Sequence, residues 1–118
     1  MMKRRDFLKS GGAAVAALPL MQAGGGAYAS RPIKMGSILD TSGIFDAYGK
    51  PMDMAARLAV DEINATGGLN GAPISFVSYD TQSDMALYTQ YGQRLVRQDR
   101  VDVVHGGILS ASREAIRQ

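Results

Sequence analysis

Short apolar runs with the period of a β-strand alternate along this chain with longer segments that have the period of an α-helix. The first run, Ile33 to Leu39, is bounded by Pro32 and by the turn-rich residues Asp40 to Gly43. Such a run between turn signals predicts a buried strand. The alternation constrains the fold class more than any other feature. The period of a strand places one face of a sheet in the core, whereas the period of a helix places one side of a helix there.

The next segment predicts an α-helix with one apolar side. Apolar residues recur at intervals of three and four positions, at Met52, Ala55, Ala56, Ala59, Val60 and Ile63. The polar residues predicted on the opposite side are Asp53, Arg57, Asp61 and Asn64. Gly67 and Gly68 end the helix, because glycine readily adopts the left-handed conformation that closes one.

Two further pairs of strand and helix follow. Ile74 to Tyr79 and Val101 to Val104 are predicted as strands. Ser83 or Asp84 can cap the second helix, and a third helix opens over Ser110 to Gln118. The predicted stripe of the second helix comprises Met85, Tyr88, Tyr91 or Gly92, Leu95 and Val96.

This order of elements indicates an α/β fold, a parallel sheet with helices on both faces and right-handed crossovers. Such a sheet has its binding crevice beyond the carboxyl ends of the strands. We therefore expect the loops Asp40 to Lys50 and His105 to Ser112 to line it. Sheets commonly have about five strands, so we expect the chain to be a fragment of a larger domain.

Residues 1–29 predict a removable leader, with the body of the protein over residues 30–118. Met1 to Ser10 is positively charged, Gly11 to Met21 is apolar, and a small-x-small cleavage site ends at Ala29, before Ser30. The apolar stretch is shorter than the roughly 20 residues that span a bilayer.

The charged part of the leader resembles a twin-arginine export motif, because Arg4 and Arg5 are followed by Phe-Leu-Lys. An amphipathic helix of a cytosolic protein is the alternative, but Pro19 and the glycines at 24–26 would break it. We expect export by the twin-arginine machinery and a periplasmic protein, soluble once the leader is removed.

Charge and cysteine content exclude several classes. The first ten residues carry +3 and the whole chain +2, so the body carries −1, which does not favour nucleic-acid binding. The chain has no cysteine and therefore no disulfide, thiolate metal site, thiol nucleophile or acceptor for a lipid anchor.

The loop after the third predicted strand carries the most chemistry. Gly106 and Gly107 allow the backbone to turn sharply and to approach a ligand. The hydroxyl of Ser110 and the N–H groups of Ala111 and Ser112 form a donor cluster at the positive end of a helix. Such a cluster binds a carboxylate or a carbonyl oxygen. The alternative is that Ser110 only caps its own helix.

The other polar candidates are interpreted as structural. His105, the only histidine, favours a structural role at a strand end over a metal site. Asp80 and Asp84 are interpreted as a solvated turn and a helix cap rather than as paired acids. The glycines between Gly67 and Gly71 precede a strand, the wrong place for a phosphate loop. No nucleophile–base pair or cofactor motif is found, so we expect neither an enzyme nor a cofactor.

Several motifs resemble the opening of type I periplasmic binding proteins: Ile33-Lys34-Met35-Gly36, Ser42-Gly43, Tyr48-Gly49, the stretch from Asp61 to Gly71, and Tyr79-Asp80. The resemblance covers nearly all of residues 33–118. It implies that residues 30–118 are the first part of the N-terminal lobe of a two-lobe fold, which closes on its ligand by a hinge motion.

The resemblance also implies site residues. In the leucine/isoleucine/valine-binding branch, the serine matching Ser110 holds the ligand carboxylate and the aromatic residue matching Tyr48 packs against the ligand. In the amide- and urea-binding branch, Ser-x-x-Arg follows the glycine loop, and Ser110 to Arg113 is similar to it. The candidate ligand-binding residues are therefore Tyr48, Leu109, Ser110 and Ala111.

The implied function is that of a solute-binding subunit of an ABC importer. It would capture a branched-chain amino acid, a short amide or urea and deliver it to the importer permease. Two alternatives stay open: a ligand-sensing module of a receptor, and an exported enzyme whose catalytic residues lie beyond residue 118.

Replacing Arg4 and Arg5 together by lysine is expected to leave the precursor in the cytoplasm, because the twin-arginine route requires both residues. The wild-type protein should yield a mature chain that starts at Ser30. Cell fractionation and N-terminal sequencing measure both outcomes. Normal export of the lysine variant would contradict the assignment to this route.

Overall fold

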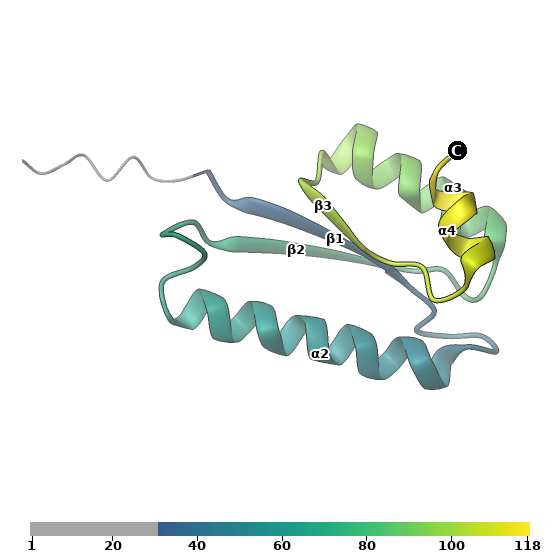
Figure 1. Cartoon of the computed structure of the whole chain (residues 1–118), viewed down its shortest axis with the longest axis horizontal. Coiled ribbons are helices and arrows are strands. Elements are labelled where there is room, and N and C mark those ends of the chain that lie inside the picture. Colours follow the sequence, from purple (N-terminus) through teal and green to yellow (C-terminus); the bar gives the residue numbers. More distant parts are fainter. Residues whose placement is uncertain (1–30) are drawn as a thin grey trace, which may run out of the picture.

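The computed structural model describes residues 31–118, so the predicted signal peptide and its cleavage site lie outside the described residues. Within the described residues, no helix combines the length and the apolar composition needed to cross a bilayer. The elements are β1 (Ile33–Leu39), α2 (Asp46–Ala65), β2 (Ile74–Asp80), α3 (Met85–Arg94), the π-helical turn η1 (Leu95–Asp99), β3 (Val103–Gly106) and α4 (Ser110–Ile116), shown in Figure 1.

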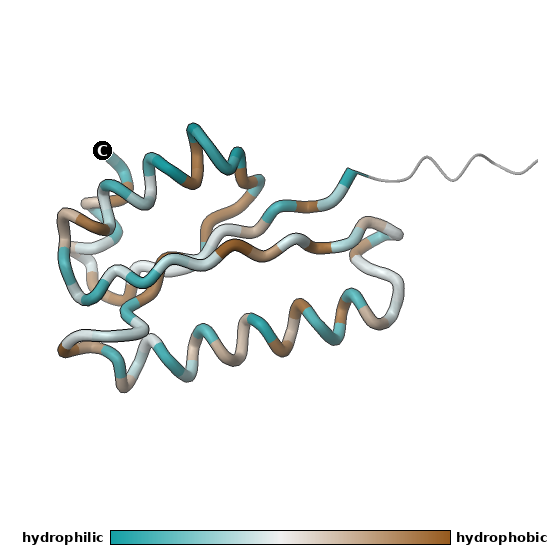
Figure 2. Tube along the Cα trace, turned by 180° about the vertical axis from the view of Figure 1, so that it is seen from behind, coloured by the Kyte–Doolittle hydropathy of each residue, from teal (hydrophilic) through white to brown (hydrophobic). Residues whose placement is uncertain are grey.

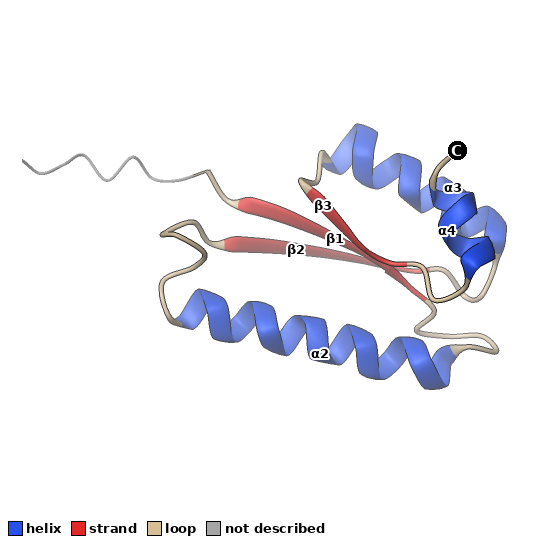
Figure 3. Cartoon of the chain, in the orientation of Figure 1, coloured by secondary structure: helices blue, strands red, loops and turns tan. Residues whose placement is uncertain are grey.

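The three strands form one parallel sheet in the order β2-β1-β3, which confirms the predicted fold class. Ile33 lies opposite Ile74, and Met35 lies opposite Val103. The chain moves from β1 to β2 in one direction and then back past β1 to β3. With right-handed crossovers, this reversal places helices on opposite faces. α2 covers one face, and α3 and α4 cover the other (Figure 1, Figure 3).

The core lies between the sheet and α3. Ile38, Tyr88 and Leu95 are fully buried there. Gly36 makes room for Leu95, because a Cβ atom at Gly36 would lie 2.8 Å from both Leu95 methyl groups. Figure 2 shows apolar residues along the strands between the two helical layers, and alternating polar and apolar residues along α2.

The second predicted helix is confirmed except at its end. The Asp84 carboxylate caps α3 by accepting a hydrogen bond from the N–H of Ala86 at 2.8 Å. The helix widens into η1 at Leu95, and this change of pitch leaves Val96 62% exposed. The prediction that Val96 belongs to the buried stripe is therefore wrong.

The start of β1 is tied to the segment before β3. Arg31 donates two hydrogen bonds to the Asp102 carboxylate, at 2.6 and 3.2 Å, and the N–H of Lys34 donates a third at 2.9 Å. The Arg31 guanidinium holds the pKa of Asp102 below its ordinary value. The N–H of Val101 donates to the carbonyl oxygen of Leu95, the first residue of η1, at 3.1 Å. β3 begins at Val103, two residues later than predicted.

Helix α2 begins earlier than predicted. It starts at Asp46, so the connection predicted to run from Asp40 to Lys50 ends at Phe45. Asp46 accepts a hydrogen bond from Lys50 at 2.6 Å, one turn further on, and this contact holds the pKa of Asp46 below its ordinary value. An acidic residue in the first turn also stabilises the positive end of the helix. Pro51 lies inside the helix.

The face of α2 that meets the sheet also differs from the prediction. Of the predicted stripe, Val60 is buried and Ala56 and Ile63 are half-buried, whereas Met52, Ala55 and Ala59 are exposed. Gly49 and Asp53, which were not predicted on this side, are buried as well. Asp53, predicted on the outer side, can be buried because Arg57 Nε and Ser78 Oγ donate to its carboxylate at 2.7 and 2.8 Å. A buried carboxylate is tolerated when it is paired in this way.

Gly49 allows the first turns of α2 to lie against the end of β1. A Cβ atom at Gly49 would lie 1.9 Å from the carbonyl oxygen of Asp40 and 2.4 Å from its carbon. The neighbour is backbone rather than a flexible side chain. The position of α2 along the sheet therefore requires glycine at residue 49.

Gly49→Ala is expected to lower the free energy of unfolding by about 1–3 kcal/mol, the usual cost of overpacking. The matched control is Gly92→Ala in α3, whose Cβ would lie 3.5 Å from Ile116, an ordinary contact. This control should be neutral or stabilising by about 0.5–1 kcal/mol. Urea unfolding of the full-length protein measures both. Equal effects of the two alanines would contradict the close contact at Gly49.

Candidate functional site

The carboxyl edge of the sheet contains a point where neighbouring connections diverge. The connection after β1 leads to α2 on one face, and the connection after β3 leads to α4 on the other (Figure 1). β1 and β3 are adjacent strands. Ligands of open parallel sheets bind in the crevice at such a point. Both of the loops that the sequence predicts at the crevice begin here.

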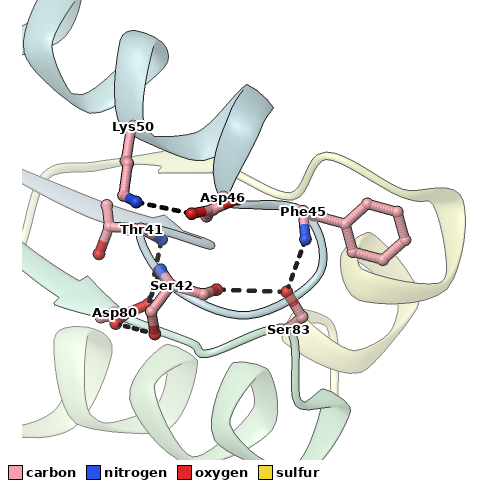
Figure 4. A network of polar contacts seen from close by, with 7 residues as sticks. All are labelled: Thr41, Ser42, Phe45, Asp46, Lys50, Asp80 and Ser83. Carbon is pink, nitrogen blue, oxygen red and sulfur yellow. Dashed lines mark hydrogen bonds and ion pairs between the residues drawn. The ribbon is translucent and has the colours of Figure 1, made fainter.

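Asp80, at the end of β2, holds the loop after β1 in place. Its carboxylate accepts hydrogen bonds from the N–H of Thr41 at 3.0 Å, the N–H of Ser42 at 3.1 Å and the Ser42 hydroxyl at 2.6 Å (Figure 4). The N–H of Gln82 donates a fourth at 2.9 Å. The interpretation of Asp80 as a solvated turn residue is therefore wrong, because its partners lie 38 and 39 residues away in the chain.

The electrostatics of Asp80 follow from these contacts. Partial burial by itself raises the pKa of the carboxyl, but the hydrogen bonds from Ser42, Gln82 and Thr41 outweigh it. The pKa therefore lies below its ordinary value, and the carboxylate is ionised at neutral pH.

Ser83 forms a second link between the same two loops. Its hydroxyl donates to the carbonyl oxygen of Ser42 at 3.3 Å and accepts from the N–H of Phe45 at 3.2 Å. The Phe45 ring points away from this network, as Figure 4 shows. The start of α2 is thus fixed from the loop after β2. The sequence offers no signal for this link, because it joins residues far apart in the chain.

The glycine turn after β3 has the predicted character. Gly106 and Gly107 have φ values of 142° and 77°, which side-chain-bearing residues rarely adopt. A Cβ atom at Gly106 would lie 2.0 Å from the carbonyl oxygen of Ile38. Gly106 is the last residue of β3 and pairs with Ile38, so the chain runs close beside the end of β1 before it enters α4.

The first turn of α4 tests the alternative given for Ser110, that this residue only caps its own helix. The cap position is Leu109, and the fully buried hydroxyl of Ser112 stabilises the turn. It donates to the Leu109 carbonyl at 2.7 Å and accepts from the Leu109 N–H at 3.0 Å. The alternative reading of Ser110 as the helix cap is therefore wrong. The Ser110 side chain is exposed, with Arg113 Nη2 3.4 Å from its hydroxyl.

The predicted donors are available at this turn. In the described part of the chain, the N–H groups of Ser110, Ala111 and Ser112 have no acceptor, as is normal at the start of a helix. The structure groups Leu109, Ser110 and Ala111 together. Tyr48 lies on the first turn of α2, on the opposite face of the sheet but at the same edge, and is 63% exposed.

His105 lies within β3 rather than in the loop after it. Its Nδ1 is 3.3 Å from the hydroxyl of Ser37 on β1. Among residues 31–118, no group of three or more side chains could hold a metal ion. The donors at the start of α4 include the Ser110 hydroxyl and free backbone N–H groups, which suit an anionic or carbonyl oxygen.

Comparison with known proteins identifies relatives of this chain. Residues 32–118 match the family described as periplasmic binding protein, and residues 1–18 match the twin-arginine translocation pathway signal sequence. A comparison with curated proteins finds no match.

Solved structures of several ABC transporter proteins have the same fold, among them the following three. The branched-chain amino acid transporter substrate-binding protein LivJ of Streptococcus pneumoniae, in complex with isoleucine, is 39% identical over 72% of this chain and 24% of its own, with a TM-score of 0.70. A putative branched-chain amino acid ABC transporter protein of Rhodospirillum rubrum is 30% identical over 73% and 25%, with a TM-score of 0.67. A fatty acid ABC transporter substrate-binding protein of Thermomonospora curvata is 25% identical over 75% and 22%, with a TM-score of 0.65.

The chain spans about a quarter of the length of these structures. The family match extends over almost all of the described residues, and the structural likeness to these three proteins covers 72%, 73% and 75% of the chain. The export signal agrees with a periplasmic location. The chain belongs to the periplasmic binding protein family.

Proposed function

We propose that the chain is the beginning of the substrate-binding subunit of an ABC importer and that its ligand is a branched-chain amino acid. In this proposal, residues 1–29 are the signal peptide and residues 30–118 are part of the N-terminal lobe. The observation that carries the proposal is the set of N–H groups at the start of α4, beside the divergence of β1 and β3. The isoleucine complex of the LivJ relative supports the choice of ligand class.

The start of α4 suits the carboxylate of an amino acid. The free N–H groups of Ala111 and Ser112 lie at the positive end of the helix, and the Ser110 hydroxyl is exposed beside them. Because Ser112 stabilises the turn, the Ser110 hydroxyl is free to donate to a ligand. Hydrogen bonds to a charged acceptor are about twice as strong as neutral ones.

Apolar residues at the same edge suit the side chain of such a ligand. Ile44, on the connection after β1, is 82% exposed, and Tyr48, on the first turn of α2, is 63% exposed. A ligand with an apolar side chain would bury part of this surface, at a gain of roughly 25 cal/mol per Å². Urea has no apolar side chain, so this surface favours an amino acid over urea.

The loop after β1 is ordered before any ligand arrives, because Asp80 and Ser83 hold it. A preorganised loop avoids the entropy cost of ordering on binding. In the proposed function, the second lobe of the complete protein closes over the ligand by a hinge motion. The importer permease then recognises the closed form.

Ser110→Ala is expected to weaken the binding of isoleucine by about ten- to a hundredfold, because a hydrogen bond to a charged group contributes roughly 1.5–3 kcal/mol. The melting temperature without ligand should stay unchanged, since Ser110 is not the helix cap. Calorimetry with isoleucine, a short amide and urea measures affinity in the full-length protein, and a thermal melt measures stability.

The matched control is Ser75→Ala, a change at an exposed serine on β2. It should alter neither affinity nor melting temperature. Unchanged affinity in Ser110→Ala would contradict the proposed contact between Ser110 and the ligand. A wild-type protein that binds urea or a short amide but not isoleucine would overturn the choice of ligand class.

Asp80→Asn is expected to lower the free energy of unfolding at pH 7 by about 1.5–3 kcal/mol, the contribution of hydrogen bonds to a charged group. The folded pKa of Asp80 lies below the unfolded value, so the stabilisation is complete above about pH 4 and is lost as the pH falls through the folded pKa. The difference between wild type and variant should therefore shrink as the pH is lowered below about 4.

Urea unfolding at a series of pH values measures this dependence. Asp61→Asn serves as the control, because Asp61 is exposed on α2. The control should show no loss of stability that depends on pH in this range. A loss in Asp80→Asn that stays the same at every pH would show that the carboxylate charge does not hold the loop.

A further inference from the structure

The connection from α2 to β2 contains a two-residue turn. Leu69 and Ala72 form an isolated antiparallel bridge, and each donates its N–H to the carbonyl oxygen of the other, at 2.8 and 2.9 Å. The two residues between them, Asn70 and Gly71, have φ values of 51° and 81°. Positive φ at both central residues is the mark of a type I′ turn, and Asn-Gly is the pair that this turn favours.

Turn geometry explains why these two residue types are present, but their order also makes a reactive pair. The side-chain amide carbon of Asn70 and the backbone nitrogen of Gly71 can join in a five-membered ring. A side chain on the residue after an asparagine hinders this ring closure, and glycine has none. No atom of a neighbouring residue lies within 4 Å of the place where a Cβ atom at Gly71 would be, so the space around the pair is open as well.

The fold holds neither of the two reacting groups. Among residues 31–118, the Asn70 side chain and the Gly71 N–H form no hydrogen bond, and both residues are exposed. Exposed turns open locally at a low free-energy cost compared with the unfolding of a core strand. Ring closure therefore requires rotation within the turn and leaves the sheet intact.

Asn64, the other asparagine of the chain, has the opposite environment. It lies on α2 and is half-buried. Its Nδ2 donates to the carbonyl oxygen of Ile74 at 2.8 Å, and its Oδ1 accepts from the Ile74 N–H at 2.7 Å. Its side-chain amide is therefore fixed, and the residue that follows it, Ala65, has a methyl group. The chain thus contains one free and one restrained asparagine.

We propose that Asn70 is a site of spontaneous deamidation, for which water is the only co-reactant. The backbone nitrogen of Gly71 attacks Cγ of Asn70, the bond between Cγ and Nδ2 breaks, and the Gly71 proton leaves with the amide nitrogen as ammonia. The product is a succinimide ring. Water then opens this ring at either of its two carbonyl carbons, which gives aspartate or isoaspartate at residue 70.

This modification site lies at the edge of the sheet opposite the crevice. The turn precedes β2, whereas α4 follows the carboxyl end of β3, and Figure 1 shows the two regions at opposite ends of the sheet. Isoaspartate adds a methylene group to the backbone of a turn whose two-residue length matches the bridge that it closes. Asn64 still holds Ile74, so the change is confined to the turn. The inference is independent of the proposed function, and its test needs no ligand.

The test keeps the full-length protein in a mildly alkaline buffer, where the Gly71 nitrogen is deprotonated most readily. Mass spectrometry follows the tryptic peptide over residues 58–94, which contains both asparagines. Fragmentation assigns the gain in mass from amide to carboxyl to one residue, and chromatography separates isoaspartate from aspartate. Asn70→Gly is the matched variant, because Gly-Gly also suits a type I′ turn and lacks the side-chain amide. A sample kept in urea gives the reaction of the unfolded chain.

In the folded protein, Asn70 should convert roughly tenfold faster than Asn64 or more, since Asn64 must first lose two hydrogen bonds. Isoaspartate should be among the products, and the peptide of Asn70→Gly should keep its mass. Three results would overturn the inference: conversion of Asn70 no faster than that of Asn64, an equal gain in mass in Asn70→Gly, or aspartate as the sole product. Conversion that occurs only in urea would overturn it too, because the folded turn would then protect the amide.

Discussion

One carboxylate organises the edge of this sheet. Asp80 accepts four hydrogen bonds, and three of them come from the loop after β1. The loop is thereby held to the end of the neighbouring strand. The Ser83 hydroxyl also bonds the loop, at the carbonyl of Ser42, and the N–H of Phe45 just before α2. With that start in place, α2 lies close enough to β1 that only glycine fits at residue 49. These contacts hold the loop that borders the crevice and the residue from which α2 starts.

The fold could be predicted from local sequence because its signals are local. β1 has the predicted bounds, Ile33–Leu39, since Pro32 and the turn residues after Leu39 mark both ends. The buried face of α2 could not be predicted in this way. Asp53 faces the sheet because Ser78, 25 residues further along, supplies a partner. A pattern of apolar spacing assigns every aspartate to solvent, and only a tertiary contact reverses that assignment.

The candidate site, too, could be predicted from the sequence only in part. The glycine turn and the donors after it follow from residue type and position, and the structure has them where the sequence predicts. Which serine stabilises the turn depends on the backbone angles at Leu109, and a shift of two residues separates Ser110 from Ser112. That shift matters for function, because it leaves the Ser110 hydroxyl exposed. Asp80 was missed for a similar reason, since its partners come from a loop almost 40 residues earlier.

The central place of β1 has a mechanical consequence. β1 is the first strand of residues 31–118, and it is hydrogen-bonded to β2 on one side and to β3 on the other. Tension on the leader, directed along β1, would load both ladders in shear, so that many bonds must break together. Arg31 adds a bidentate link to Asp102 at the point where such a force enters. The lobe thus resists pulling at the end to which the export signal is attached.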